Sequence, residues 1–132
     1  MIYLLDTNVI SDLMRADRRV EDWMAGLETV DRLVICTIVK GEILFGISKL
    51  PHGKRRVELE QAGRQFLGAF DCEPIPERAA DSYASMKSFR SRRGLALDEN
   101  DLWIAATALA LDATLVSRDG DFAVAKHETR LD

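Results

Sequence analysis

The stretch Met1-Ile2-Tyr3-Leu4-Leu5-Asp6-Thr7-Asn8 places an unbroken apolar run directly before a carboxylate. A short continuous apolar run is typical of a strand that is buried on both faces of a sheet. In open α/β sheets, the functional site lies at the carboxyl ends of the strands. The stretch therefore predicts an α/β fold and makes Asp6 the first candidate site residue.

Further along the chain, apolar runs of strand length alternate with segments of helical periodicity. This alternation predicts βα units, a mainly parallel central sheet and helices on both of its faces. Repeats and interdomain linkers are absent from the sequence, so residues 1–132 are expected to form a single domain. We expect strands at 2–5, 32–36, 114–117 and near 129–131, and a short strand and turn at 72–76. We expect helices at 38–50 and 98–110 and in four further segments: one directly after Asp6, one around 20–27, one ending near 70 and one from Pro76 to about Gly94. Thr37 is the predicted N-cap of the helix 38–50.

The composition is that of a folded protein, with 47% apolar and 30% charged residues among 132. No apolar run reaches the roughly 20 residues that span a bilayer, and no signal peptide is evident. Cys36 and Cys72 form no C-x-x-C pair. We therefore expect no membrane association, a cytoplasmic location and buried free thiols.

The net charge of −4 argues against a protein that coats nucleic acid nonspecifically. If four carboxylates are committed to a metal, however, the rest of the chain is about neutral. The basic residues fall into two groups, which are either solvated helix ends or phosphate contacts. These groups are Lys49, Lys54, Arg55 and Arg56, and then Lys87, Arg90, Arg92 and Arg93.

Two acidic residues in the first half of the chain are candidate site residues. Asp6 is equally well explained as the N-cap of the helix that follows, and Asn8 either caps that helix or supports a metal-bound water. Glu42 is harder to explain structurally, because its helical neighbours Ile38, Val39, Phe45 and Gly46 are apolar or small. An ion pair with Lys or Arg is the alternative for Glu42.

Two further candidates lie in the second half. Asp101 fits the first turn of a helix capped by Asp98, which accounts for an acid there without any chemistry. Asp119 and Asp121 flank Gly120, and Asp-Gly is a common turn pair. Asp119 is the first choice because it is nearer the strand end, and Asp121 is the reserve.

Carboxylates that converge from distant parts of a chain repel one another unless a positive charge lies between them. A hard divalent cation such as Mg²⁺ or Mn²⁺ is the expected compensating charge, and such cations serve phosphoester chemistry. His52 and His127 have no Cys or His at ligand spacing, and the sequence contains no Gly-rich phosphate loop.

Taken together, these residues resemble the PIN-domain nucleases, in particular the VapC-type toxins of toxin–antitoxin pairs. The resemblance implies a three-layer α/β/α sandwich and a Mg²⁺- or Mn²⁺-dependent endoribonuclease. It also implies that Asp6, Glu42, Asp101 and Asp119 are metal ligands, directly or through water, and that Asn8 and Ser117 support them. The matching pieces are Leu5-Asp6-Thr7-Asn8, Glu42-Ile43-Leu44-Phe45-Gly46, Asp101-Leu102-Trp103-Ile104-Ala105-Ala106-Thr107-Ala108 and Leu115-Val116-Ser117-Arg118-Asp119.

The resemblance further implies an RNA substrate, a homodimer and a VapB-like antitoxin partner whose C-terminal segment crosses the cleft. The chain departs from the family pattern in having Ser117 where Thr is common, and in ending without the acidic-aromatic segment of many relatives. A catalytically silent PIN-like module that binds RNA or protein is the alternative from another class. A phosphoryl-transfer domain with Asp6 as nucleophile is disfavoured, because Asp6 is followed by Thr7-Asn8 and no second acid.

Overall fold

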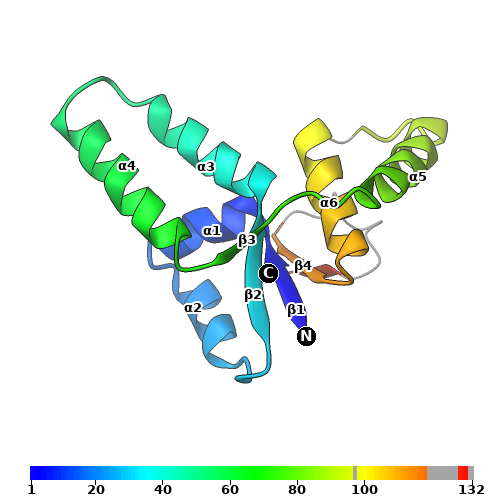
Figure 1. The fold of residues 1–132 in the computed structure, drawn as a ribbon, viewed down its shortest axis with the longest axis horizontal. Helices are drawn as coiled ribbons and strands as arrows, with labels where there is room; N and C mark the ends of the chain where they lie inside the picture. The colour runs from blue at the N-terminus through cyan, green and yellow to red at the C-terminus, as the bar shows by residue number, and fades with distance from the viewer. Residues whose placement is uncertain (97, 119–127, 131–132) are drawn as a thin grey trace.

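The computed structural model describes residues 1–96, 98–118 and 128–130 of the chain (Figure 1). Within these residues, five parallel strands form one sheet in the order β3-β2-β1-β4-β5. The expected parallel sheet is thus confirmed, and the weak last strand pairs with β4. The strands are β1 (Ile2–Leu5), β2 (Arg32–Cys36), β3 (Asp71–Glu73), β4 (Thr114–Ser117) and β5 (Glu128–Arg130).

Helices connect the strands in pairs. The described helices are α1 (Thr7–Met14) and α2 (Arg18–Ala25), then α3 (Thr37–Ser48) and α4 (Lys54–Leu67), and finally α5 (Ala79–Arg92) and α6 (Glu99–Ala110). The α3–α4 hairpin and the α5–α6 pair project beyond the sheet as two arms, one on each side (Figure 1). Both arms lie toward the carboxyl ends of the strands, because α3 starts directly where β2 ends.

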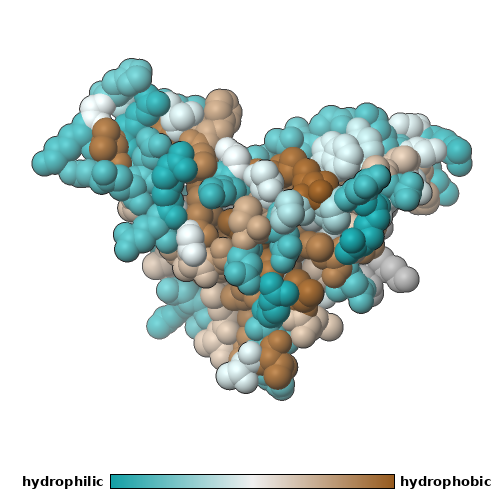
Figure 2. All heavy atoms as spheres, in the orientation of Figure 1, coloured by the Kyte–Doolittle hydropathy of each residue, from teal (hydrophilic) through white to brown (hydrophobic). Residues whose placement is uncertain are grey.

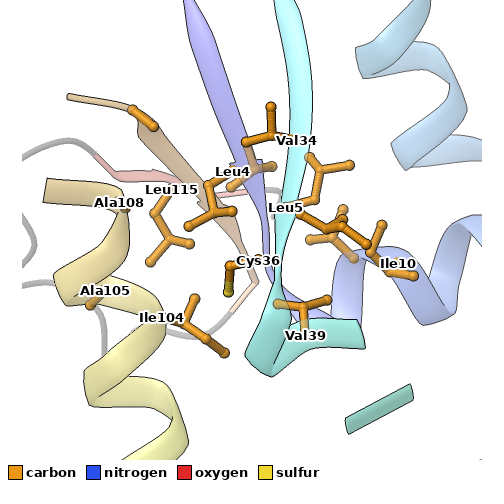
Figure 3. Packing of buried hydrophobic residues seen from close by; sticks show 14 of the residues in the cluster. Leu4, Leu5, Ile10, Val34, Cys36, Val39, Ile104, Ala105, Ala108 and Leu115 are labelled. Atoms are coloured by element: carbon orange, nitrogen blue, oxygen red, sulfur yellow. The ribbon is translucent and has the colours of Figure 1, made fainter. Parts of the chain in front are cut away.

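The alternation of side chains along β1 divides the core into two halves (Figure 3). Leu4 is in register with Val34 and Leu115, so these three side chains share a face and lie toward α6. Leu5 points to the opposite face, toward Ile10 of α1. All five side chains are fully buried. The expected three-layer α/β/α arrangement is therefore present, with helices packed on both faces of the sheet.

The N-cap expected at Thr37 is wrong by one residue. Cys36 is the N-cap of α3, and its side chain makes no capping hydrogen bond. Thr37 is already helical, and its hydroxyl donates instead to the carbonyl of Glu73, 3.4 Å away. This hydrogen bond connects α3 to the end of β3, so the Thr37 hydroxyl does not cap the helix.

Two further predictions need correction. The helix expected to start at Pro76 begins at Ala79, because Pro76 and Glu77 first form a tight turn that accepts from the amides of Ala79 and Ala80. Of the two thiols expected to be buried, Cys36 is buried but Cys72 is exposed, since β3 lies at the edge of the sheet. No helix in the described part of the chain is long and apolar enough to cross a membrane.

The small residues of α6 allow this helix to lie close to the sheet, and this generates a stability prediction. Ala105 is a residue of α6 and is fully buried. We expect Ala105→Leu to lower the free energy of unfolding by about 1–3 kcal/mol, because the added methyl groups have no space in a close-packed interior. Urea unfolding measures the loss. Ala84→Leu, at an exposed position of α5, is the matched control and should change the stability little.

Candidate active site

The site lies where β1, β2 and β4 end. These strands are adjacent and parallel, so their carboxyl ends share one edge of the sheet. Asp6 follows β1, Ser117 ends β4, and Glu42 lies in the helix that follows β2. The order of the strands therefore brings together residues that are more than a hundred positions apart in the sequence.

Asp6 is buried, with 3% of its surface exposed. One carboxylate oxygen, Oδ1, accepts a hydrogen bond from the backbone amide of Thr7 at 2.7 Å, and Asp6 is the N-cap of α1. The other oxygen, Oδ2, accepts from the hydroxyl of Ser117 at 3.1 Å. The two donors and the positive end of α1 stabilise a negative charge that burial would otherwise penalise. The capping role is thus observed, and it leaves the carboxylate at the end of the sheet.

Glu42 is half-buried and lies one turn into α3. Its Oε1 accepts a hydrogen bond of 2.5 Å from the hydroxyl of Thr7, and its Oε2 lies 3.4 Å from the side-chain amide of Asn100, which donates to it. Thr7 therefore holds both candidate carboxylates, through its amide to Asp6 and through its hydroxyl to Glu42. Through the contact from Asn100, the start of α6 is also connected to Glu42.

Asp101 is half-buried in the first turn of α6, next to Asn100. The turn is fixed by Asp98, the N-cap, whose carboxylate accepts from the amide of Asn100 at 2.8 Å. The cap expected at Asp98 is therefore confirmed. Asp119 and its reserve Asp121 lie outside the described residues. Among the residues that the structure describes, no three His, Cys, Asp or Glu side chains form a group that could hold a metal ion.

The polar residues around the acids differ in part from those expected. Ser117 is fully buried and contacts Asp6 directly. Asn8 is exposed on the first turn of α1, and in the described part of the chain it makes no hydrogen bond to Asp6 or Glu42. Sequence reasoning missed Thr7 and Asn100 as site residues. The position of the Thr7 hydroxyl next to the capping acid Asp6 was the available signal for Thr7. The residue to which this hydroxyl donates, Glu42, is 35 positions away in the sequence.

An open groove runs beside Glu42. It has a volume of about 580 Å³ and is lined by Thr7, Ile38, Gly41, Glu42, Phe45, Gly46, Lys49 and Asn100. A Cβ added at Gly41 or Gly46 would meet no neighbouring atom within 4 Å, so the surface beside Glu42 is open at both glycines. A second, more apolar groove of about 360 Å³ shares Thr7, Glu42 and Gly46 and continues between α1, α3 and α4. Figure 2 shows hydrophilic residues at the tips of both arms and mixed polar and apolar residues between them.

The model of a known family matches residues 3–128, and its description is PIN domain. This chain belongs to the PIN domain family. Among its relatives, VapC ribonuclease Y4jK of Sinorhizobium fredii is 33% identical over 88% of this chain and 86% of its own length. Toxin FitB of Neisseria gonorrhoeae is 34% identical over the same shares of the two chains. The resemblance inferred from the four sequence motifs is thereby confirmed.

Solved structures also share the fold. VapBC2 from Rickettsia felis, bound to a DNA fragment from their promoter, superimposes with a TM-score of 0.86 at 26% identity and covers all of both chains. FitAB bound to IR36 DNA gives a TM-score of 0.82 at 30% identity, covering 98% of this chain and 94% of that chain.

A surface cluster fixes the start of α6 in this PIN domain. Tyr83 stacks on Trp103, with ring centroids 4.0 Å apart and an angle of 7° between the planes. The Tyr83 hydroxyl donates to Glu99 at 2.5 Å, and the Lys87 ammonium donates to Glu99 at 2.6 Å. Because Glu99 immediately precedes Asn100 and Asp101, these contacts from α5 hold the first turn of α6 in place.

The second group of basic residues is therefore only partly free to contact phosphate. Lys87 is engaged by Glu99, and Arg90 is buried with 7% exposed. The Arg90 guanidinium donates to the carbonyl of Ala96 at 2.7 Å, so it fixes the connection between α5 and α6. For Arg90, both interpretations, a solvated helix end and a phosphate contact, are wrong. The side chain is buried, and its guanidinium donates to the backbone carbonyl of Ala96.

An ion pair to a buried carboxylate anchors the chain just after β4. Asp12 of α1 is 3% exposed, and its Oδ2 lies 2.8 Å from Nε of Arg118. The contact does not meet hydrogen-bond geometry, so it is a Coulombic attraction rather than a directed bond. Arg15 contacts the other oxygen of Asp12 at 2.9 Å. No local pattern around Asp12 indicates this role, and its partner Arg118 directly precedes the candidate Asp119 in the sequence.

Cys36 lies at the same edge of the sheet as the acids, at the end of β2. Burial raises the pKa of its thiol, and the negative charge of Asp6 adds to the effect. The thiol therefore stays protonated near neutral pH and is a poor nucleophile. Its place is in the core, where it packs with Leu4 and Val39.

The Glu99 cluster generates a pH prediction. Hydrogen bonds from Lys87, and then from Tyr83, lower the pKa of Glu99 below its ordinary value of 4.5. A lowered folded-state pKa stabilises the protein fully above pH 4.5, and this contribution is lost as the pH falls through the folded-state pKa. We expect the wild type to be more stable than Glu99→Gln at pH 7 and the two to converge in acid, measured by urea unfolding across pH.

The control for this experiment is Asp22→Asn, which removes an exposed carboxylate from α2. It should show no comparable change in stability relative to the wild type. A difference between wild type and Glu99→Gln that stayed constant from neutral to acidic pH would contradict the assignment, because the carboxylate charge would then not carry the effect.

Proposed function

We propose that this chain is a metal-dependent endoribonuclease that acts as the toxin of a type II toxin–antitoxin pair. The observation that carries the proposal is the pair of carboxylates, Asp6 and Glu42, held by Thr7 at the carboxyl edge of a PIN-domain sheet. Support comes from relatives named as VapC ribonucleases and as a toxin over most of both chains.

The described donors suit a hard divalent cation. Asp6, Glu42, Thr7, Asn100 and Ser117 offer only oxygen atoms and one amide around the edge of the sheet. Carboxylate and carbonyl oxygens suit Mg²⁺ and Mn²⁺, whereas Zn²⁺ prefers sulfur and nitrogen. We propose that Asp6, Glu42, Asp101 and Asp119 hold the ion, directly or through water, with Asp121 as the reserve for the fourth position.

When bound, Mg²⁺ or Mn²⁺ supplies charge neutralisation at the scissile phosphate and a more acidic water. The chain's own residues prepare the site for this chemistry. Ser117 and the Thr7 amide keep Asp6 oriented in a buried, charged state, and Asn100 fixes the second oxygen of Glu42. The groove beside Glu42 leaves room for a single strand to pass the acids. Hydrolysis there would leave a 5′-phosphate and a 3′-hydroxyl.

The proposed partners are an RNA substrate, a second copy of the chain and a VapB-like antitoxin, all in the cytoplasm. The apolar groove between α1, α3 and α4 reaches Glu42, so an antitoxin segment lying in it would end beside the acids. A basic side chain on that segment would pair with the carboxylates, and an Arg fits them in a bidentate manner. Such a contact would exclude both metal and RNA.

We expect the carboxylates to be required for RNA cleavage. Asp6→Asn, Glu42→Gln and Asp101→Asn should each reduce cleavage of a labelled total RNA pool to background, because each removes charge that attracts the cation. Chelation by EDTA should have the same effect on the wild type, and added Mg²⁺ or Mn²⁺ should restore cleavage. The readout is the appearance of RNA fragments on a gel.

Asp22→Asn is the matched control, since it removes an equal charge from an exposed position on α2 and should leave cleavage unchanged. Cleavage that survives both EDTA and Asp101→Asn would refute the metal-dependent mechanism. Calorimetry with Mn²⁺ distinguishes the proposed nuclease from the alternative, a catalytically silent module. Such a module should not bind the metal at these acids and should not cleave the RNA.

We expect Thr7 to act as a positioning residue. Thr7→Val keeps the backbone amide for Asp6 and the branched shape, but it removes the hydroxyl that donates to Glu42. By analogy with groups that orient metal ligands, the loss should lower activity or metal affinity roughly 10- to 100-fold. Titration of Mn²⁺ by calorimetry measures the affinity. Thr7→Ser, which retains the hydroxyl, should behave nearly as the wild type. Equal losses in Thr7→Ser and Thr7→Val would contradict the role of the hydroxyl.

A further inference from the structure

We propose that Phe45 and Lys49 form a nucleotide-binding subsite on the rim of the acidic groove. In this subsite, the Phe45 ring stacks on a base next to the scissile phosphate, and the Lys49 ammonium contacts a neighbouring phosphate. The proposal rests on the proposed ribonuclease function and adds to it the residues that hold the substrate strand.

The two residues share one helix face with Glu42. Positions 42, 45 and 46 of α3 and its C-cap residue, 49, are three or four residues apart from 42 to 45 or 46 and from 45 or 46 to 49, and all four line the same groove. A strand of RNA bound by Phe45 would therefore pass over Glu42. The subsite and the candidate active site are thus two ends of a single groove.

Phe45 is unusually open for an aromatic residue. Its side chain is 61% exposed, whereas most of the large apolar residues in the described part of α3 pack into the core. An exposed ring beside a polar groove costs stability, because apolar surface remains in water. The bases of single-stranded RNA stack on such rings, since every base has a π face.

Lys49 adds a positive charge to the lining of the groove, which also contains the acid Glu42. Its Nζ lies 4.6 Å from the centroid of the Phe45 ring, which holds the ammonium near the ring. Among the described residues, no carboxylate forms an ion pair with Lys49. Since the acids repel a phosphate, a cation on the same rim gives the RNA backbone a favourable contact.

The two glycines give the nucleotide its space. Gly41 precedes Glu42, Gly46 follows it one helical turn later, and a Cβ on either one would meet nothing within 4 Å. The wall of the groove therefore has open space at both glycines, beside Glu42 and Phe45. This combination of ring, cation and open wall favours a nucleotide over a protein segment, for which the neighbouring apolar groove is better suited.

A similar pair elsewhere in the chain provides a matched control. Phe89 of α5 is 40% exposed, and the guanidinium carbon of Arg93 lies 3.6 Å from its ring centroid. The hollow around this pair is lined by Ala84, Ser85, Ser88 and Arg92 and contains no acidic residue. The Phe89–Arg93 pair has the same chemistry as the Phe45–Lys49 pair, but it does not line the groove that contains Glu42.

The test measures RNA binding separately from cleavage. In the full-length Asp6→Asn variant, which does not cleave under the proposed function, fluorescence anisotropy follows a labelled single-stranded RNA of mixed sequence across a salt series. Phe45→Leu should weaken binding roughly 5- to 100-fold, and Phe45→Tyr should retain it. Lys49→Gln should reduce the slope of log Kd against log salt by about 0.7. Phe89→Leu and Arg18→Gln, an exposed position on α2, should leave affinity and slope unchanged.

Two results would overturn the subsite. One is unchanged RNA affinity and salt slope in Phe45→Leu and Lys49→Gln, with native circular dichroism. The other is a change in the number of copies per particle in Phe45→Leu, measured by light scattering, which would make Phe45 a protein contact. Both leave the proposed function standing if the wild type cleaves RNA and Asp6→Asn does not. Loss of that difference would instead refute the ribonuclease proposal.

Discussion

The two hydrogen bonds from Thr7 hold the candidate site together. Asp6 and Glu42 are acids from different elements, and at short range their charges repel. Thr7 offers a neutral donor to each, through the amide at 2.7 Å and the hydroxyl at 2.5 Å. A neutral residue between two carboxylates orients both without cancelling their charge. The site therefore keeps the negative potential that a cation would need, and the cost of burying Asp6 is reduced by local donors.

The parallel sheet supplies the framework for these contacts. Because β1, β2 and β4 run the same way, their carboxyl ends meet at one edge, where helices α1 and α3 begin. α6 is held to that edge from the outside by Glu99 and its partners on α5. Asp6 thus stands at the start of α1, where the backbone amide of Thr7 donates to it. The helices α3 and α5 belong to the two arms that project on either side of the sheet (Figure 1).

Much of this arrangement followed from local patterns. The strands 2–5, 32–36 and 114–117 have the bounds that their apolar runs predicted, and Asp98 caps α6 as expected. The errors lie where a contact outside the helix overrides a local preference. Thr37 turns its hydroxyl to Glu73 on β3, and Arg90 turns inward to the carbonyl of Ala96. Neither partner is visible in the local sequence, so propensity alone could not identify these roles.

The order of apolar runs and acids was sufficient to establish the α/β class, the family and the candidates Asp6, Glu42 and Asp101, because a buried strand and the acid that follows it are neighbours in the chain. The supporting contacts depend on the folded structure. Thr7 meets Glu42 across 35 positions, Asn100 meets Glu42 across 58, and Ser117 meets Asp6 across 111. Such contacts form only when strand order and helix packing have fixed the distances between elements, since hydrogen bonds need their donors and acceptors within about 3 Å.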